Sequence, residues 1–142
     1  MASFTTQIPD LANVGPIISI TLAPSMLRED LLRARGQSVP SPMTVSAMID
    51  IGSSATVIRE DLAQQLKLEL VGSTLINTPS STDVFCCEYF ARLSLPHDIV
   101  FENVVIAAPL QKQNVECLIG RDILQHGVLV YIGHNDSFTL SF

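Results

Sequence analysis

Residues 47–54 of this chain read Ala-Met-Ile-Asp-Ile-Gly-Ser-Ser, and the rest of the sequence is best interpreted from them. A short apolar run, typical of a buried strand, ends at Asp50 and is followed by Gly52 and two serines. Aspartate, glycine and serine favour turns, so the stretch predicts a strand that enters a tight turn. A carboxylate at the end of a buried strand is costly to desolvate unless it has a role. Asp50 is therefore the first candidate for a functional residue.

Residues 117–124, Cys-Leu-Ile-Gly-Arg-Asp-Ile-Leu, form a second informative stretch. It predicts an apolar strand that bends at Gly120 and continues into a short helix beginning with Arg121 and Asp122. Taken alone, each stretch has an ordinary explanation, a turn in the first case and a strand-to-helix junction in the second. Their order, their separation and the apolar residues before each of them are much less common in combination.

Together the two stretches resemble the motifs of the retropepsin-like aspartic proteases of the bacterial, single-domain, homodimeric type. In that family the first motif reads apolar-apolar-Asp-Thr/Ser-Gly-Ala/Ser, and the second reads apolar-apolar-Gly-Arg-Asp/Asn-apolar-Leu. The matching positions here are Asp50, Gly52, Ser53, Ile119, Gly120, Arg121, Asp122 and Leu124. Ile51 departs from the pattern, because the family has a hydroxyl residue there. The resemblance covers residues 16–142, which we interpret as one domain.

The resemblance implies an all-β fold: a retropepsin-like acid protease half-barrel with short helices, in a two-fold symmetric homodimer. It implies an aspartic endopeptidase that hydrolyses peptide bonds without a cofactor, with one Asp50 from each subunit forming the dyad that activates water. The implied site residues are Asp50 as the catalytic group, Ile51, Gly52 and Ser53 in the active-site loop, Gly120, Arg121 and Asp122 as support, and Thr78, Pro79, Ser80 and Ser81 in a substrate-binding flap. The alternative for the flap is an ordinary surface hairpin.

Ile51 bears directly on activity, since the family's hydroxyl bonds across the dimer axis to the backbone of the partner's loop. Losing such a bond costs about 0.5–1.5 kcal/mol, and a buried N–H left unpaired costs about 1–3 kcal/mol. Two alternatives therefore stand beside the active enzyme. One is a catalytically weak or silent retropepsin-fold dimer that binds peptides or scaffolds a complex. The other is a regulatory domain within a larger assembly.

The remaining pattern predicts many short strands and two helices. Strands are expected at 16–22, 43–49, 55–58, 71–95 (as a hairpin), 100–107, 115–119, 128–132 and 138–142, and helices at 25–35 and 59–68. Residues 1–15 are polar and uneven and are expected to be poorly ordered. The strand at 138–142 has no evident partner within the chain, and the resemblance implies that it pairs with another subunit.

The composition limits the partners. Charged residues make up 15% of the 142 residues, below the usual share of about 25%, so we expect a partner, most simply a second copy, to cover part of the surface. A net charge of −6 argues against nucleic acid and anionic membranes. No apolar run reaches the length of a membrane span and no early basic residue suggests a secretory signal, so a cytoplasmic location is expected. The spacing of the cysteines and histidines predicts no metal site.

Overall fold

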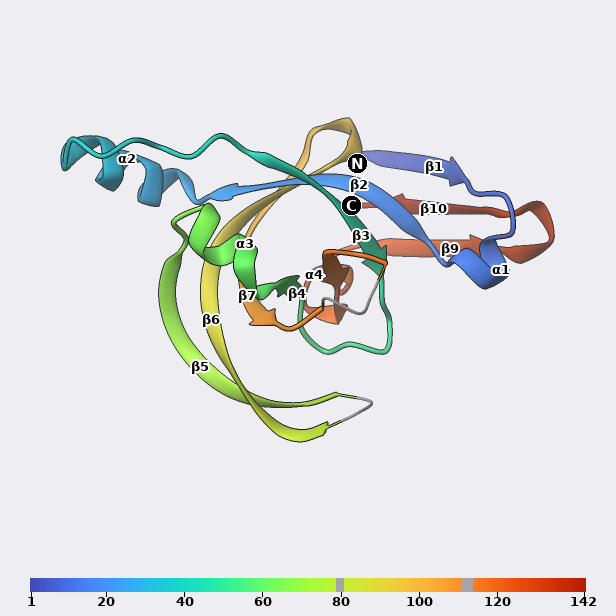
Figure 1. Ribbon diagram of the computed structural model, residues 1–142. Coiled ribbons are helices and arrows are strands. Elements are labelled where there is room, and N and C mark those ends of the chain that lie inside the picture. Colours follow the sequence, from blue (N-terminus) through green and yellow to red (C-terminus); the bar gives the residue numbers. More distant parts are fainter. Residues whose placement is uncertain (79–80, 111–113) are drawn as a thin grey trace.

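The computed structural model describes residues 1–78, 81–110 and 114–142 (Figure 1). These residues form ten strands, four short α-helices and two 3₁₀ helices, the last labelled η1 and η2. In chain order the elements are β1 (Ser3–Gln7), α1 (Leu11–Val14), β2 (Ile17–Pro24), α2 (Met26–Ala34), β3 (Met43–Ile49), β4 (Val57–Arg59), α3 (Glu60–Gln65), β5 (Glu69–Thr78), β6 (Ser81–Leu95), η1 (Pro96–Asp98), β7 (Ile99–Ala108), β8 (Cys117–Ile119), α4 (Arg121–Leu124), β9 (Val128–Ile132), η2 (Gly133–Asn135) and β10 (Ser137–Ser141). The predicted all-β class is confirmed.

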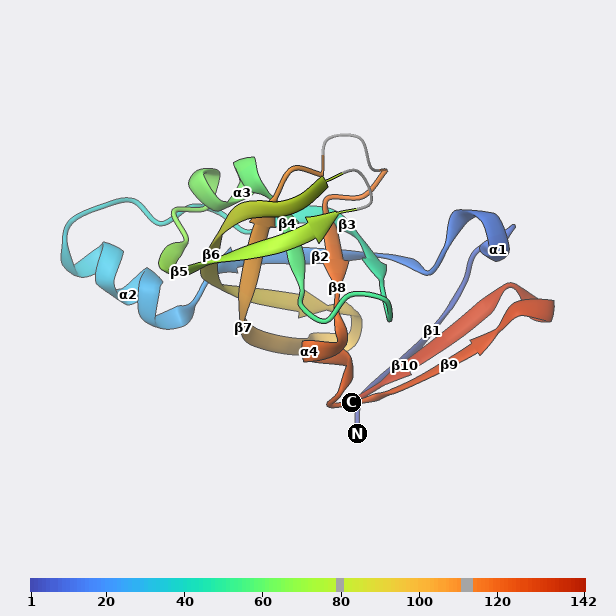
Figure 2. The same cartoon turned by 90° about the horizontal axis from the view of Figure 1, so that it is seen from below.

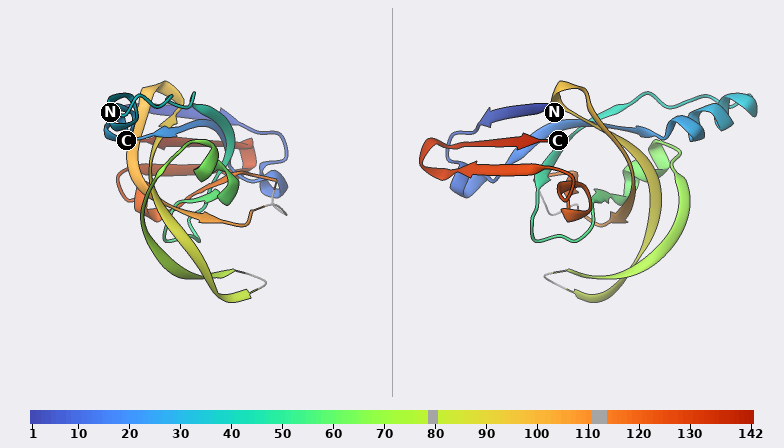
Figure 3. Two further views of the ribbon diagram at one scale, coloured as in Figure 1. Left: turned by 60° about the vertical axis from the view of Figure 1, so that its left-hand side comes forward. Right: turned by 180° about the vertical axis from the view of Figure 1, so that it is seen from behind.

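Seven strands form one strongly curved sheet in the order β2-β3-β8-β4-β7-β6-β5. β2 also pairs with β6, from Thr21↔Ser94 to Pro24↔Ala91, so six of these strands close into a ring. β5 lies outside the ring and extends with β6 as a long curved hairpin (Figures 1 and 3). The predicted half-barrel is therefore a six-stranded ring with a hairpin that reaches beyond it.

The two faces of this sheet bury different clusters, because side chains alternate along each strand. Ile49, Ile58 and Ile119, from β3, β4 and β8, belong to the main core on one face. Their chain neighbours Val57 and Leu118 belong to a smaller cluster on the other face. Central strands that are covered on both faces read as continuous apolar runs. This explains why residues 47–49 and 117–119, which directly precede Asp50 and Gly120, are continuously apolar.

Helix α2 confirms the helix predicted at residues 25–35. The Ser25 hydroxyl accepts a hydrogen bond from the backbone N–H of Arg28 at 3.1 Å, which satisfies one free donor of the first turn. Glu29 forms an ion pair with Arg92 of β6 at 2.7 Å, and Leu32 is buried. The helix extends away from the ring on the side opposite the terminal strands (Figure 2). None of the helices in the described residues is long and apolar enough to span a membrane.

The two chain ends form a separate three-stranded sheet in the order β1-β10-β9. The prediction that residues 1–15 are poorly ordered differs from the structure, where Phe4 and Leu11 are buried in the main core. The prediction that the C-terminal strand lacks a partner within the chain is wrong, since β10 pairs with β1 on one edge and β9 on the other. The physical reason is burial: Phe138 and Leu140 of β10 are fully enclosed in the main core, as is expected of a strand that lies between two others.

Candidate active site

The two motifs found in the sequence lie side by side in the structure. β3 and β8 are parallel neighbours with Ile49 opposite Ile119. The backbone N–H of Asp50 continues this ladder by donating to the carbonyl oxygen of Ile119 at 2.9 Å. The ends of the two strands are thus fixed against one another, and the loop that carries Asp50 begins directly beside Gly120.

The Asp50 carboxylate is oriented by its own turn. Its Oδ1 accepts a hydrogen bond from the backbone N–H of Gly52 at 2.9 Å, and the N–H of Ser53 donates to the Asp50 carbonyl at 3.2 Å. A Cβ atom at Gly52 would lie 3.1 Å from Oδ1, so a larger residue would crowd this oxygen. Oδ2 has no hydrogen-bond partner in the parts of the chain that the structure describes. The half-buried carboxylate therefore presents one free oxygen.

Ser53 shapes the loop rather than contacting the Asp50 carboxylate. Its hydroxyl donates to the carbonyl oxygen of Ala55 at 2.6 Å, and its own carbonyl accepts the N–H of Arg121 at 2.9 Å. Both bonds tie the loop to itself and to the start of α4. These contacts of Ser53 are those of a turn residue.

Gly120 allows the closest backbone approach at the site. A Cβ atom built on it would lie 2.4 Å from the backbone C and O of Ala55, a distance that real Cβ atoms do not show. The strand that precedes α4 can therefore pass the loop after Asp50 only because residue 120 lacks a side chain. This is a physical reason for the glycine in the second motif.

Asp122 braces the loop through Thr56. Its carboxylate accepts hydrogen bonds from the Thr56 N–H at 3.0 Å, the Thr56 hydroxyl at 2.8 Å, the Asn103 side-chain amide at 2.8 Å and the N–H of Ile123 at 2.9 Å. The Thr56 hydroxyl oxygen in turn accepts the N–H of Gly120 at 3.1 Å. Thr56 is fully buried. Thr56 and Asn103 were not predicted from the sequence, because their role depends on contacts with distant segments.

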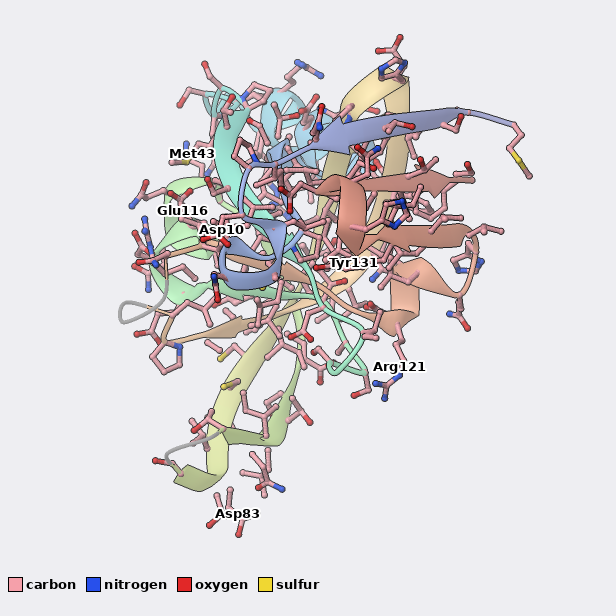
Figure 4. The ribbon with its side chains drawn as sticks, turned by 90° about the vertical axis from the view of Figure 1, so that its right-hand side faces the viewer. Asp10, Met43, Asp83, Glu116, Arg121 and Tyr131 are labelled. Atoms are coloured by element: carbon pink, nitrogen blue, oxygen red, sulfur yellow. The ribbon has the colours of Figure 1, made fainter. Side chains whose placement is uncertain are left out.

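Arg121 holds the first part of the loop. Its Nη1 donates to the carbonyl oxygen of Ile51 at 2.6 Å (Figure 4 shows Arg121 beside this loop). Ile51 is 66% exposed, so most of its surface is not covered by the described residues. The second motif thus holds residues 51–56 at both ends: Arg121 bonds to Ile51 and Ser53, and Gly120 and Asp122 bond to Thr56.

The Asp50 loop and the β5–β6 hairpin enclose a cleft of about 1300 Å³. Asp50, Gly52 and Ser53 line it on one side, and Thr78 and Ser81 line it from the hairpin. The hairpin curves so that its end lies across from the loop (Figures 1 and 3). Pro79 and Ser80, the other two residues of the predicted flap, lie outside the described residues.

Two of the three cysteines, Cys86 and Cys117, lie in surroundings that disfavour a reactive thiolate. All three cysteines are free thiols. Burial raises the pKa of the Cys117 thiol above its ordinary value, with nearby Asp122 adding to the effect, and burial also raises the pKa of Cys86. A raised pKa disfavours the thiolate form that a nucleophile needs. No group of three or more potential metal ligands comes together in the described segments.

Comparison with known proteins identifies the family. Residues 39–123, more than half of the chain and including both motifs, match the aspartyl protease family. The fold is similar to the crystal structure of a retropepsin-like aspartic protease from Rickettsia conorii, with a TM-score of 0.53 and 14% sequence identity over 100% of this chain and 95% of that chain. No curated protein sequence matches the chain. The chain therefore belongs to the aspartyl protease family and has its retropepsin-like, all-β fold.

Proposed function

We propose that the protein is an aspartic endopeptidase that hydrolyses peptide bonds as a homodimer. One observation carries the proposal: Asp50 presents a free carboxylate oxygen in a cleft that lies beneath an extended hairpin. Membership of the aspartyl protease family supports the same reaction. A fold alone does not define an activity, so the argument depends on this carboxylate and its surroundings.

The chemistry requires a second carboxyl group. Hydrolysis of an amide needs one group to activate water and another to protonate the carbonyl oxygen or the leaving amine. Asp50 and Glu88 have the only carboxyl groups among the described residues that line the cleft, and Glu88 on β6 lies four strand spacings from Met48, which is two residues before Asp50. A two-fold symmetric dimer supplies the partner by placing Asp50 beside its symmetry mate.

In such a pair the two carboxyl groups share one proton, because like charges in close contact cannot both ionise; the aspartic-protease dyad is the known case. The ionised Asp50 takes a proton from water as the oxygen attacks the scissile carbonyl carbon. The protonated Asp50 of the other subunit donates to the carbonyl oxygen. Collapse of the tetrahedral intermediate breaks the C–N bond, and a proton passes to the leaving amine.

The hairpin and the loop fit an extended peptide. Cleft-lining residues of β5 and β6 come from strands whose alternate side chains face the same way. A peptide bound in extended form would make main-chain hydrogen bonds and place alternate side chains in pockets. We therefore expect unfolded or flexible segments to be the preferred substrates.

A second candidate function is a peptide-binding dimer with little or no activity. The observation that favours it is Ile51, which has no hydroxyl to link the two loops across the axis and is 66% exposed in the single chain. In that case the cleft would bind peptides while the two carboxyl groups remain too poorly aligned for hydrolysis.

Peptide cleavage at acidic pH separates the two candidates. The wild-type protein should cleave a mixed peptide library, a statine-type transition-state mimic should inhibit it, and Asp50→Asn should abolish cleavage with an unchanged circular dichroism spectrum. Binding of peptides without any cleavage would favour the second candidate. Cleavage that persists in Asp50→Asn would contradict the proposed mechanism.

A further inference from the structure

The floor of the cleft is one row of cross-strand neighbours that runs across the sheet. Glu88 of β6 pairs with Ile106 of β7, Ile106 pairs with Val57 of β4, Val57 pairs with Leu118 of β8, and Leu118 pairs with Met48 of β3. Directly paired residues share a face of a sheet, and all five line the cleft. Four of the five are apolar. Glu88 at the far end is the exception.

The Glu88 carboxylate is unpaired within the described part of the chain. It is half-buried, and it makes no hydrogen bond or ion pair with any described residue. Its register neighbour on β5 is Gly72, where a Cβ atom would lie 3.3 Å from Glu88 Oε1. The pairing is irregular between Leu70 and Gly72, which marks a bulge at this point. A glycine at a bulge leaves room for the carboxylate against the strand.

The charges in the cleft are of one sign. Among its described lining residues, Asp50 and Glu88 are the only ionisable side chains, and no lysine or arginine is present. The whole chain also carries a net charge of −6. A half-buried carboxylate at the end of an apolar row attracts a cation more strongly than an exposed one, because fewer waters screen it.

We propose that Glu88 forms a subsite for a basic side chain, lysine or arginine, of the peptide substrate. The inference rests on the proposed function, since it concerns which peptides enter the same cleft. The long aliphatic stem of lysine or arginine would lie along Ile106, and its charged end would reach the carboxylate. Glu88 is thus a specificity-determining residue.

The subsite lies away from the scissile bond. The row from Met48 to Glu88 crosses four strand spacings, or about 19 Å along the curved sheet, and Asp50 lies two residues beyond Met48. An extended peptide advances about 3.3 Å per residue, so the preferred basic residue lies several positions from the bond that is cut. In the proposed dimer each half of the cleft contains one Glu88, so a basic residue is favoured on either side of the cut.

A lysine scan tests the subsite. In a peptide that the enzyme cleaves, lysine or its uncharged analogue norleucine is placed at each position in turn, and kcat/KM is measured. We expect lysine to be preferred by about tenfold at a position several residues from the scissile bond. Glu88→Gln should reduce the lysine-to-norleucine ratio to near one. Glu88→Lys should reduce the ratio below one, and a peptide with glutamate at the same position should then be preferred to the lysine peptide. Glu69→Gln, which removes an exposed charge on β5 outside the cleft lining, should leave the ratio unchanged.

A binding measurement makes the result independent of hydrolysis. Fluorescence anisotropy of the same labelled peptides with Asp50→Asn protein should show the same lysine preference, and the double variant with Glu88→Gln should lose it. Preference in binding without cleavage by the wild type would uphold the subsite and contradict the proposed hydrolysis. A lysine-to-norleucine ratio that is near one in the wild type, or unaltered by Glu88→Gln, would overturn the subsite.

Discussion

At the scale of single residues, Gly120 is a position of the candidate site that has no room for a side chain. A methyl group there would overlap the backbone of Ala55, and neither segment can move without disturbing the Asp50 loop. We expect Gly120→Ala to lower the free energy of unfolding by about 1–3 kcal/mol or more and to reduce peptide cleavage. Urea denaturation and a peptide assay check this. Unchanged stability would show that the loop can shift away from β8 at little cost.

Ile51 is the one motif residue whose chemistry differs from the family. If a hydroxyl at this position links the two loops of the proposed dimer, Ile51→Thr should strengthen both dimerisation and turnover. Two regained bonds are worth about 1–3 kcal/mol, or roughly 5- to 150-fold in the dimer dissociation constant. Ile51→Val is the matched control, since valine has the shape of threonine without the hydroxyl. Sedimentation and peptide turnover of the wild type and both variants separate the effect of side-chain shape from the effect of the hydrogen bond.

The opposite result for Ile51→Thr is equally informative. An exposed isoleucine at the tip of a loop can pack against its symmetry mate and stabilise a dimer through apolar contact. A threonine variant that dimerises more weakly and cleaves no faster would show that Ile51 is an adapted contact residue.

At the scale of elements, the junction between the Asp50 loop and α4 depends on the Asp122 carboxylate. Removing it would leave the Thr56 hydroxyl and two backbone N–H groups without their acceptor. We expect Asp122→Ala to cost about 2–4 kcal/mol of unfolding free energy and to reduce activity more than dimerisation. Thr56→Ser, which keeps both donors, should cost about 1 kcal/mol or less. Denaturant titration measures both. Equal losses in the two variants would contradict this role for the carboxylate.

The C-terminal strand β10 is a core element, which changes the expected effect of mutating it. Phe138 is fully buried, whereas Val130 on the neighbouring edge strand β9 is 46% exposed. We expect Phe138→Ala to cost about 3–5 kcal/mol and Val130→Ala to cost about 0.5 kcal/mol or less. Thermal unfolding followed by circular dichroism gives the comparison. A Phe138→Ala protein that stays fully folded but becomes monomeric would mean that β10 serves mainly the dimer.

Much of the fold could be predicted because the informative patterns are local. The strand before Asp50, the helix capped by Ser25 and the hairpin at 71–95 all appear in the structure near their predicted bounds. The role of β1 could not be predicted in this way, because a short strand of serine and threonine around Phe4 gives little signal until β10 lies beside it. The pairing of the two chain ends cannot be predicted from the sequence pattern of either segment alone.

In the candidate site too, residues in local motifs could be predicted and residues that depend on contacts with distant segments could not. The motifs located Asp50, Gly120 and Asp122, and the structure places all three in adjoining segments. Thr56 was missed although it lies two residues after Ser54, the end of the first stretch; a lone polar residue between apolar neighbours was the available signal. Glu88 was missed because its importance depends on sheet register, which the sequence does not specify.

At the scale of the whole molecule, the proposed dimer must use surfaces other than β10. Both edges of that strand are occupied within the chain, so the terminal sheet can pair further only through β1 or β9. The Asp50 loops, with Ile51 exposed, provide the other contact. Dimerisation should therefore be visible by sedimentation at micromolar concentration, and specific activity should fall on dilution below the dissociation constant.

The central claim is that two Asp50 residues from two chains form one active site. Mixing subunits tests this claim most directly. Wild-type protein is allowed to exchange subunits with an equal amount of Asp50→Asn protein, and total peptide cleavage is compared with wild type alone at the same wild-type concentration. Mixed dimers contain one aspartate and should be inactive, so activity should fall to about half, and further with excess variant. Activity that stays constant after exchange, while sedimentation shows mixed dimers, would show that each chain works alone and would contradict the account.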